Sequence, residues 1–95
     1  MKFGLTEIRI EQGVYANGRR AIIAVDTETG ERYANITVNL VDAPCTCTQA
    51  YINTNNLKYN HYEALKKAGI ISREPISYAQ SGYYSYPLHQ ILIEP

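Results

Sequence analysis

The chain lacks several residue types that mark particular classes of protein. It has no tryptophan, one phenylalanine and two cysteines, and its nine basic residues balance nine acidic ones. Zero net charge argues against general nucleic-acid binding, which needs an excess of lysine and arginine, and a mimic of DNA would need a dense carboxylate surface. At 95 residues and 45% apolar content, we expect one folded domain covering residues 1–95.

Long apolar segments are also missing from the sequence. No run of roughly 18 apolar residues is present, so nothing is expected to span a membrane. A signal peptide has a basic end followed by an apolar run, and the N-terminal stretch of this chain does not combine the two. We therefore expect a cytoplasmic protein without membrane contact.

The residues that usually carry enzyme chemistry are few. Cys45 and Cys47 stand two positions apart, which strains any disulfide between them in an extended chain. The two histidines, His61 and His89, form no zinc-binding spacing with each other or with the cysteines. No glycine-rich phosphate loop occurs. We expect no enzyme activity, no cofactor and no metal site.

The first 40 residues predict an antiparallel meander. Three segments have strand patterns: 3–11, 20–26 and 32–40. Asn17-Gly18 separates the first two segments and predicts a type I′ hairpin turn, which needs a positive φ at both positions. Gly30 ends the second turn and is expected in the left-handed conformation.

One short helix is predicted after residue 56. Asn56 or Asn60 can cap its start, and Gly69 is placed to end it at the first non-helical position. Its buried side is expected to consist of three residues: Tyr62, Leu65 and Ala68.

Further strand-like segments occupy much of the second half of the chain: 49–53, 70–74, 76–79 and 83–93. Pro75 and Pro87 confine their segments to sheet edges, strand starts or bulges, since proline lacks the N–H of a ladder. We predict an α+β fold in which a mainly antiparallel sheet of five to six strands carries one short helix.

Tyrosine is the aromatic residue that the chain has in excess. Seven of its nine tyrosines lie beyond residue 50, and three fall in the stretch QSGYYSY at 80–86. The first three residues of this stretch, Gln80-Ser81-Gly82, predict a turn. In the strand that follows, alternation places Tyr84 and Tyr86 on one face and Tyr83 on the other. Tyrosine favours both interfaces and packed strands, so either reading stays open. Gln80 and these three tyrosines are our first choice for a binding site.

Two polar clusters are further candidates. Asn53, Asn55 and Asn56 form either a loop that starts the helix or a recognition loop at one end of the sheet. Arg19 and Arg20 flank the Asn-Gly turn and are either solvated hairpin charges or an anion site. The pattern alone does not separate these alternatives.

Three stretches together resemble a known family: ITVNL at 36–40, AYINTNN at 50–56 and AQSGYYSYPLHQILI at 79–93. This family consists of small uncharacterised proteins from bacteriophages, conjugative elements and gut bacteria. Asn53 stands where the family pattern has an acidic residue. The resemblance implies an accessory protein of a mobile element that acts inside the host cell, and it brings no established activity with it.

Three binding hypotheses follow. The first is a non-enzymatic protein that binds and modulates a host protein, for example as an inhibitor of host defence resembling anti-CRISPR proteins. The second is a nucleotide or small-molecule binder, in which tyrosines stack on bases while Arg19, Arg20 or the asparagines hold phosphates. The third, a single-stranded nucleic-acid binder, is disfavoured by the neutral charge. Edge pairing into a homodimer also remains open.

Overall fold

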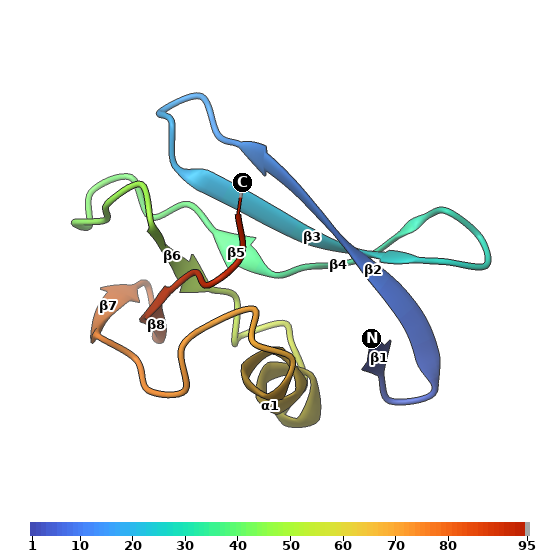
Figure 1. Ribbon diagram of the computed structural model, residues 1–95. Helices are drawn as coiled ribbons and strands as arrows, with labels where there is room; N and C mark the ends of the chain where they lie inside the picture. The colour runs from blue at the N-terminus through green and yellow to red at the C-terminus, as the bar shows by residue number, and fades with distance from the viewer. Residues whose placement is uncertain (95) are drawn as a thin grey trace.

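The computed structural model describes residues 1–94, which form two antiparallel four-stranded sheets and one helix (Figure 1). The first sheet has the order β1-β2-β3-β4, with β1 at Lys2–Phe3, β2 at Thr6–Val14, β3 at Arg20–Asp26 and β4 at Arg32–Asn35. The second has the order β5-β6-β8-β7, with β5 at Thr37–Val38, β6 at Gln49–Ile52, β7 at Ser77–Ser81 and β8 at Tyr84–Gln90. Helix α1 spans Tyr59–Lys67. The α+β class is confirmed, but the single sheet of five to six strands is wrong.

The division into two sheets occurs at Ile36, in the middle of the segment predicted as one strand. Strand β4 pairs with β3 before this residue, and β5 pairs with β6 after it. Ile36 is completely buried, and its N–H donates to the carbonyl of Ile22 at 3.0 Å. Its carbonyl accepts from the N–H of Asn53 at 2.8 Å. The apolar-polar alternation of the sequence continues through this point and therefore conceals the change of pairing partner. In the structure Thr37 is buried like Ile36, and Val38 packs with Tyr51 in a second cluster, apart from the core that contains Ile36.

The first sheet follows the predicted alternation along β2. Ile8 is buried, while Glu7 and Arg9 on either side of it are exposed. The strand does not extend back to Phe3 as predicted, because Gly4 and Leu5 form a turn. Gly4 has a φ of 63°, which reverses the chain so that the short strand β1 pairs with β2.

The hairpin between β2 and β3 has a different turn from the one predicted. Gly18 has a φ of 84°, but Asn17 has a negative φ, which excludes type I′. The N–H of Gly18 donates to the carbonyl of Tyr15 at 2.9 Å, and the N–H of Tyr15 donates to that of Arg19 at 2.8 Å. A loop of three residues therefore replaces one of two, and only its last residue needs the left-handed conformation. At the second turn, Gly30 is left-handed as expected, with a φ of 74°.

The start of α1 also differs from prediction. Lys58 occupies the N-cap position without a side-chain hydrogen bond to the helix. Asn60 lies inside the first turn, and the Asn56 side-chain amide donates instead to Oδ1 of Asn53 at 3.4 Å. The predicted asparagine caps are therefore wrong.

The end of α1 agrees with prediction. Gly69 has a φ of 74°, and its N–H donates to the carbonyl of Lys66 at 3.1 Å. The N–H of Ile70 donates to the carbonyl of Leu65 at 3.0 Å, which completes a Schellman motif. The predicted buried side is only partly correct, because His61 and Leu65 are buried, Tyr62 is half-buried and Ala68 is exposed.

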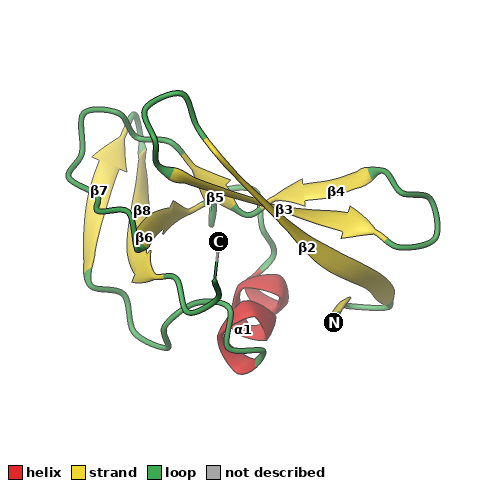
Figure 2. Cartoon of the chain, turned by 45° about the horizontal axis from the view of Figure 1, so that its top comes forward, coloured by secondary structure: helices red, strands yellow, loops and turns green. Residues whose placement is uncertain are grey.

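Apolar side chains gather in two clusters. The main core joins both sheets and α1, and its buried residues are Phe3, Ile8, Ile22, Ala24, Ile36, Ala50, Ile52, Leu57, Leu65, Ile70, Ile71 and Ile91. The smaller cluster has Tyr51, Tyr86 and Leu88 at its centre. Figure 2 shows β6, β7 and β8 together on one side, with β2, β3 and β4 on the other. The second sheet thus packs on both of its faces, since residues of β6 alternate between the two clusters.

Candidate functional site

The β7–β8 hairpin contains the whole stretch at 80–86 that was chosen first from the sequence. Gln80 and Ser81 belong to β7, so the predicted Gln-Ser-Gly turn is wrong. The turn consists of Gly82 and Tyr83, and Gly82 has a φ of 64°. A glycine at the first central position of a two-residue loop is typical of a type II′ turn. Tyr83 therefore projects from the tip, 99% exposed, instead of lying on a strand face.

Tyr84 and Tyr86 share one face of the second sheet, as alternation predicted. Tyr84 pairs with Ser81, and Tyr86 pairs with Ala79. Their surroundings differ, because Tyr86 is 8% exposed within the smaller cluster and Tyr84 is 52% exposed. Only Tyr84 of this pair is available to a partner.

The other face of the hairpin carries Tyr78 and Gln80, which pair with Pro87 and Ser85. Strand β8 is not a sheet edge, contrary to the expectation from its proline. Its pairing with β6 ends at Leu88, so Pro87 pairs only with β7. The missing N–H of the proline thus falls where β8 has lost one neighbour.

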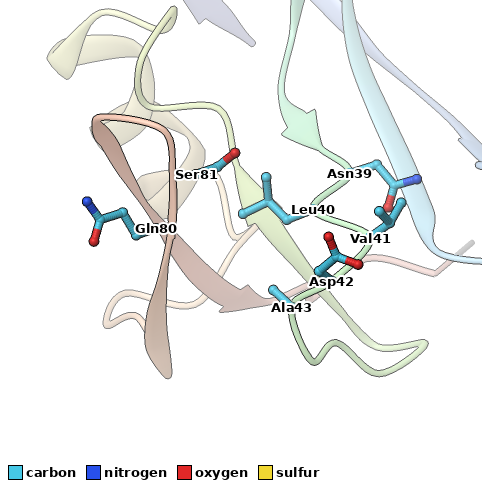
Figure 3. A pocket seen from close by; sticks show the side chains of 7 residues that line it. All are labelled: Asn39, Leu40, Val41, Asp42, Ala43, Gln80 and Ser81. Atoms are coloured by element: carbon cyan, nitrogen blue, oxygen red, sulfur yellow. The ribbon is translucent and has the colours of Figure 1, made fainter.

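A shallow groove of about 290 Å³ lies between the hairpin and the turn at 39–43 (Figure 3). The side chain of Ser81 points toward this turn, and the side chain of Gln80 points away from it, as their opposite strand faces require. Arg19 holds the turn in place. Its Nη1 donates to the carbonyl of Leu40 and its Nη2 to the carbonyl of Ala43, both at 2.6 Å.

Arg20 has its own partners, away from Arg19. It is 8% exposed, and its guanidinium donates to the carbonyl of Ile93 at 3.0 Å and to Oε1 of Gln12. The guanidinium groups of both arginines thus bond to neutral oxygens of the chain. Both side chains connect segments that are far apart in the sequence.

The asparagine loop follows β6 and leads to α1. Asn53 is 7% exposed, and its Nδ2 donates to the carbonyl of Asn35 at 3.3 Å. Asn55 and Asn56 are exposed. Thr54 in the same loop shares a pocket with residues of the Tyr78 face. The predicted site residues therefore do not converge on one surface.

This pocket has a volume of about 300 Å³ and was not anticipated from the sequence. Three tyrosines line it: Tyr59 and Tyr62 from α1 and Tyr78 from β7. Leu57 and Pro87 add apolar surface. We call it the tyrosine pocket. The excess of tyrosine beyond residue 50 was the available signal, but the spacing could not reveal which rings meet.

A hydrogen-bonded chain fixes Tyr62 in the tyrosine pocket. The Tyr62 hydroxyl bonds to Nε2 of the fully buried His89, whose Nδ1 lies 2.8 Å from the carbonyl of Ser72. Because a carbonyl only accepts, Nδ1 donates to it and Nε2 accepts from the tyrosine. Burial lowers the pKa of His89, and burial raises the pKa of Tyr62 to about 12. Both groups are held neutral.

The remaining candidate groups are dispersed. Cys45 donates from its thiol to the carbonyl of Gln49 at 3.3 Å, and burial raises the pKa of this thiol. Cys47 is exposed. His61 stacks on Phe3, with ring centroids 4.6 Å apart. Within residues 1–94, no group of three His, Cys, Asp or Glu side chains is arranged to hold a metal ion.

Comparisons with protein-family models, with curated proteins and with solved structures give no match to this chain. Across residues 1–94, no helix has the length and apolar character needed to cross a membrane.

Proposed function

We propose that this chain is a non-enzymatic binding protein whose β7–β8 hairpin engages another protein. The observation that carries the proposal is the free edge of β7. This strand has five residues, Ser-Tyr-Ala-Gln-Ser, and ends the second sheet without a charged residue or a proline. Such an edge is a ready template for strand addition by a partner.

The other edge strands among residues 1–94 are shorter or charged. Strand β1 has two residues and includes Lys2, β4 includes Arg32, and β5 has two residues. Natural sheets commonly protect their edges by such short strands and charges. Among these edge strands, only β7 departs from this pattern, and with five residues it is also the longest of them.

Exposed apolar and aromatic side chains surround this edge on several sides. Tyr78 is 64% exposed on one face, Tyr84 is 52% exposed on the other, and Tyr83 is 99% exposed at the tip. Ile76, just before β7, is 51% exposed. Tyrosine is enriched at energetically dominant positions of interfaces because it buries a large ring at low entropic cost.

A host protein is the partner that we propose, with the chain acting inside the host cell. The resemblance to a family from bacteriophages and conjugative elements supports this choice, and a component of host defence fits that setting. Nucleotide binding through Arg19 and Arg20 has less support, because the chain's own oxygens occupy both guanidinium groups.

The outward-facing backbone groups of β7 allow a sharp test. Ser81 and Tyr84 close the two-residue turn, so ladder alternation directs the N–H of Ala79 toward β8 and that of Gln80 outward. Gln80→Pro therefore removes an edge donor and leaves the pairing with β8 intact. Gln80→Ala retains the N–H and is the matched control.

The experiment captures partners from bacterial host lysates on immobilised wild-type protein and on the two variants, after circular dichroism confirms equal folding. We expect a stoichiometric protein that binds wild type and Gln80→Ala but is lost with Gln80→Pro. Absence of any stoichiometric protein across relevant hosts, or equal capture by Gln80→Pro, would refute the proposed binding edge.

A further inference from the structure

We infer that the tyrosine pocket binds a proline-containing segment of a partner protein in the extended polyproline II conformation. This inference deepens the proposed protein-binding function and depends on it. Its first support is the composition of the walls, in which the three tyrosines together with Leu57 and Pro87 outnumber the polar residues Thr54 and Ser85. Aromatic-lined grooves of this kind receive proline rings, and the preformed conformation of the ligand limits the entropic cost of binding.

The second support is the rigidity of the pocket wall formed by Tyr62. The hydroxyl of this tyrosine is bonded to His89, and the ammonium group of Lys66 lies 4.3 Å from the centre of its ring. Contacts at both the hydroxyl and the ring restrict the rotamers that this side chain can adopt. A wall positioned in advance loses less conformational entropy when a ligand binds.

The third support is the unused hydrogen-bonding capacity at the rim. Among residues 1–94, the tyrosine hydroxyls that hydrogen-bond to protein atoms belong to Tyr15, Tyr51 and Tyr62. Those of Tyr59 and Tyr78 therefore remain available on residues that are 76% and 64% exposed. A polyproline II segment has no internal hydrogen bonds and offers carbonyl oxygens, which match hydroxyl donors.

The fourth support is the electrostatic character of the pocket. All its lining residues are uncharged, and the nearby Lys66 is paired with Glu63 at 3.3 Å. A nucleotide would bring a phosphate to a pocket whose lining residues include no cation, whereas a neutral apolar peptide requires no counter-charge. The chemistry of the pocket therefore favours the peptide.

The test uses a fluorescein-labelled decaproline peptide and the full chain, with a glycine-serine peptide of equal length as the control ligand. We expect saturable anisotropy with decaproline and amide NMR shifts confined to the surroundings of Leu57, Tyr59 and Ser85. Tyr59→Ser and Tyr78→Ser should each weaken binding roughly tenfold or more, as expected for anchor residues. Both side chains are exposed, so these variants should fold.

Tyr83→Ser and Tyr84→Ser are matched controls, since they remove exposed tyrosines outside the pocket, and should change the affinity less than about twofold. No saturable binding up to about 1 mM peptide, a limit of very weak affinity, would overturn the inference. So would equal losses in the controls, or larger shifts of the same amides by adenosine monophosphate. If decaproline fails while the Gln80→Pro variant still loses a host partner, the pocket assignment falls and the proposed function remains.

Discussion

The two sheets share antiparallel pairing but differ in the kinds of side chain and strand edge that they expose to solvent. The first sheet has exposed, charged side chains along β2 and a basic residue in each of its edge strands, β1 and β4. The second sheet packs apolar residues on both faces and still leaves tyrosines and an uncharged edge in solvent. Charges and short edges prevent unwanted pairing, and their absence from β7 is the difference on which the proposed partner edge rests.

The two apolar clusters differ in their number of buried residues and in the elements that they join. The main core combines twelve buried residues from both sheets and the helix region, whereas the smaller cluster has three. The smaller cluster is covered in part by the 39–43 turn, which Arg19 fastens through two backbone carbonyls. Stability should therefore depend chiefly on the main core, and the shape of the hairpin surface should depend on the smaller cluster.

The largest expected effect comes from the residue that joins the two sheets. Ile36→Ala should lower the free energy of unfolding by about 3–4 kcal/mol, because a fully buried isoleucine leaves a cavity. Val38→Ala, half-buried in the smaller cluster, is the control and should cost about 1–2 kcal/mol. Urea denaturation followed by circular dichroism measures both. Equal losses would mean that the clusters contribute alike and would remove the contrast between them.

The next effect concerns the fastening of the smaller cluster. Arg19→Ala removes two hydrogen bonds from a charged donor and should destabilise the protein by about 2 kcal/mol. Hydrogen exchange should accelerate most at Ala43, whose N–H donates to the carbonyl of Leu40, and little in β3. Leu92→Ala, at a 56% exposed position, serves as the control for a substitution with little effect. A uniform acceleration across both sheets would contradict the local role of Arg19.

Local signals predicted much of the fold, whereas changes of partner remained hidden. The alternation of β2 and the glycine end of α1 were readable, because each depends on residues close together in the sequence. The transfer at Ile36 was not, since one strand pattern serves two sheets. The site shows the same limit. Alternation placed Tyr84 and Tyr86 on one face, but the meeting of Tyr59 with Tyr78 depends on how α1 packs against the second sheet.

A smaller difference in stability is expected between variants of the two buried tyrosines of the smaller cluster, Tyr51 and Tyr86. The Tyr51 hydroxyl donates to the carbonyl of Pro44 at 2.7 Å, so Tyr51→Phe should cost about 1 kcal/mol. Tyr86→Phe should change stability by less than about 0.5 kcal/mol. Among residues 1–94, only the hydroxyls of Tyr15, Tyr51 and Tyr62 hydrogen-bond to protein atoms, so this substitution removes no such bond. Thermal unfolding of both variants checks this difference. Because both variants keep the ring, equal losses would show that the bond from Tyr51 to Pro44 adds no stability beyond that of the Tyr86 hydroxyl.

The smallest expected effect is the pH dependence of stability that His89 causes, which is absent at neutral pH and appears in acid. Burial lowers the folded-state pKa of His89 from the ordinary value of 6.5, so the fold favours the neutral ring. Its contribution to stability is full above pH 6.5. As pH falls below that value, the unfolded chain binds a proton before the folded chain does, and stability declines until the folded-state pKa is passed.

His61→Gln and His89→Gln compare the main core with the tyrosine pocket in this respect. Burial lowers the pKa of His61 as well, but that ring stacks on Phe3, whereas a proton on Nε2 of His89 removes the acceptor of the Tyr62 hydroxyl. When the pH is lowered from 7.5 to 5.5, the urea midpoint should therefore fall less in His89→Gln than in wild type. The fall in His61→Gln should be closer to that of wild type. In wild type, acid should also broaden the NMR signals of Tyr62 before those of Phe3. The reverse order would place the acid-sensitive contact in the main core, and the tyrosine pocket would then keep its shape across this pH range.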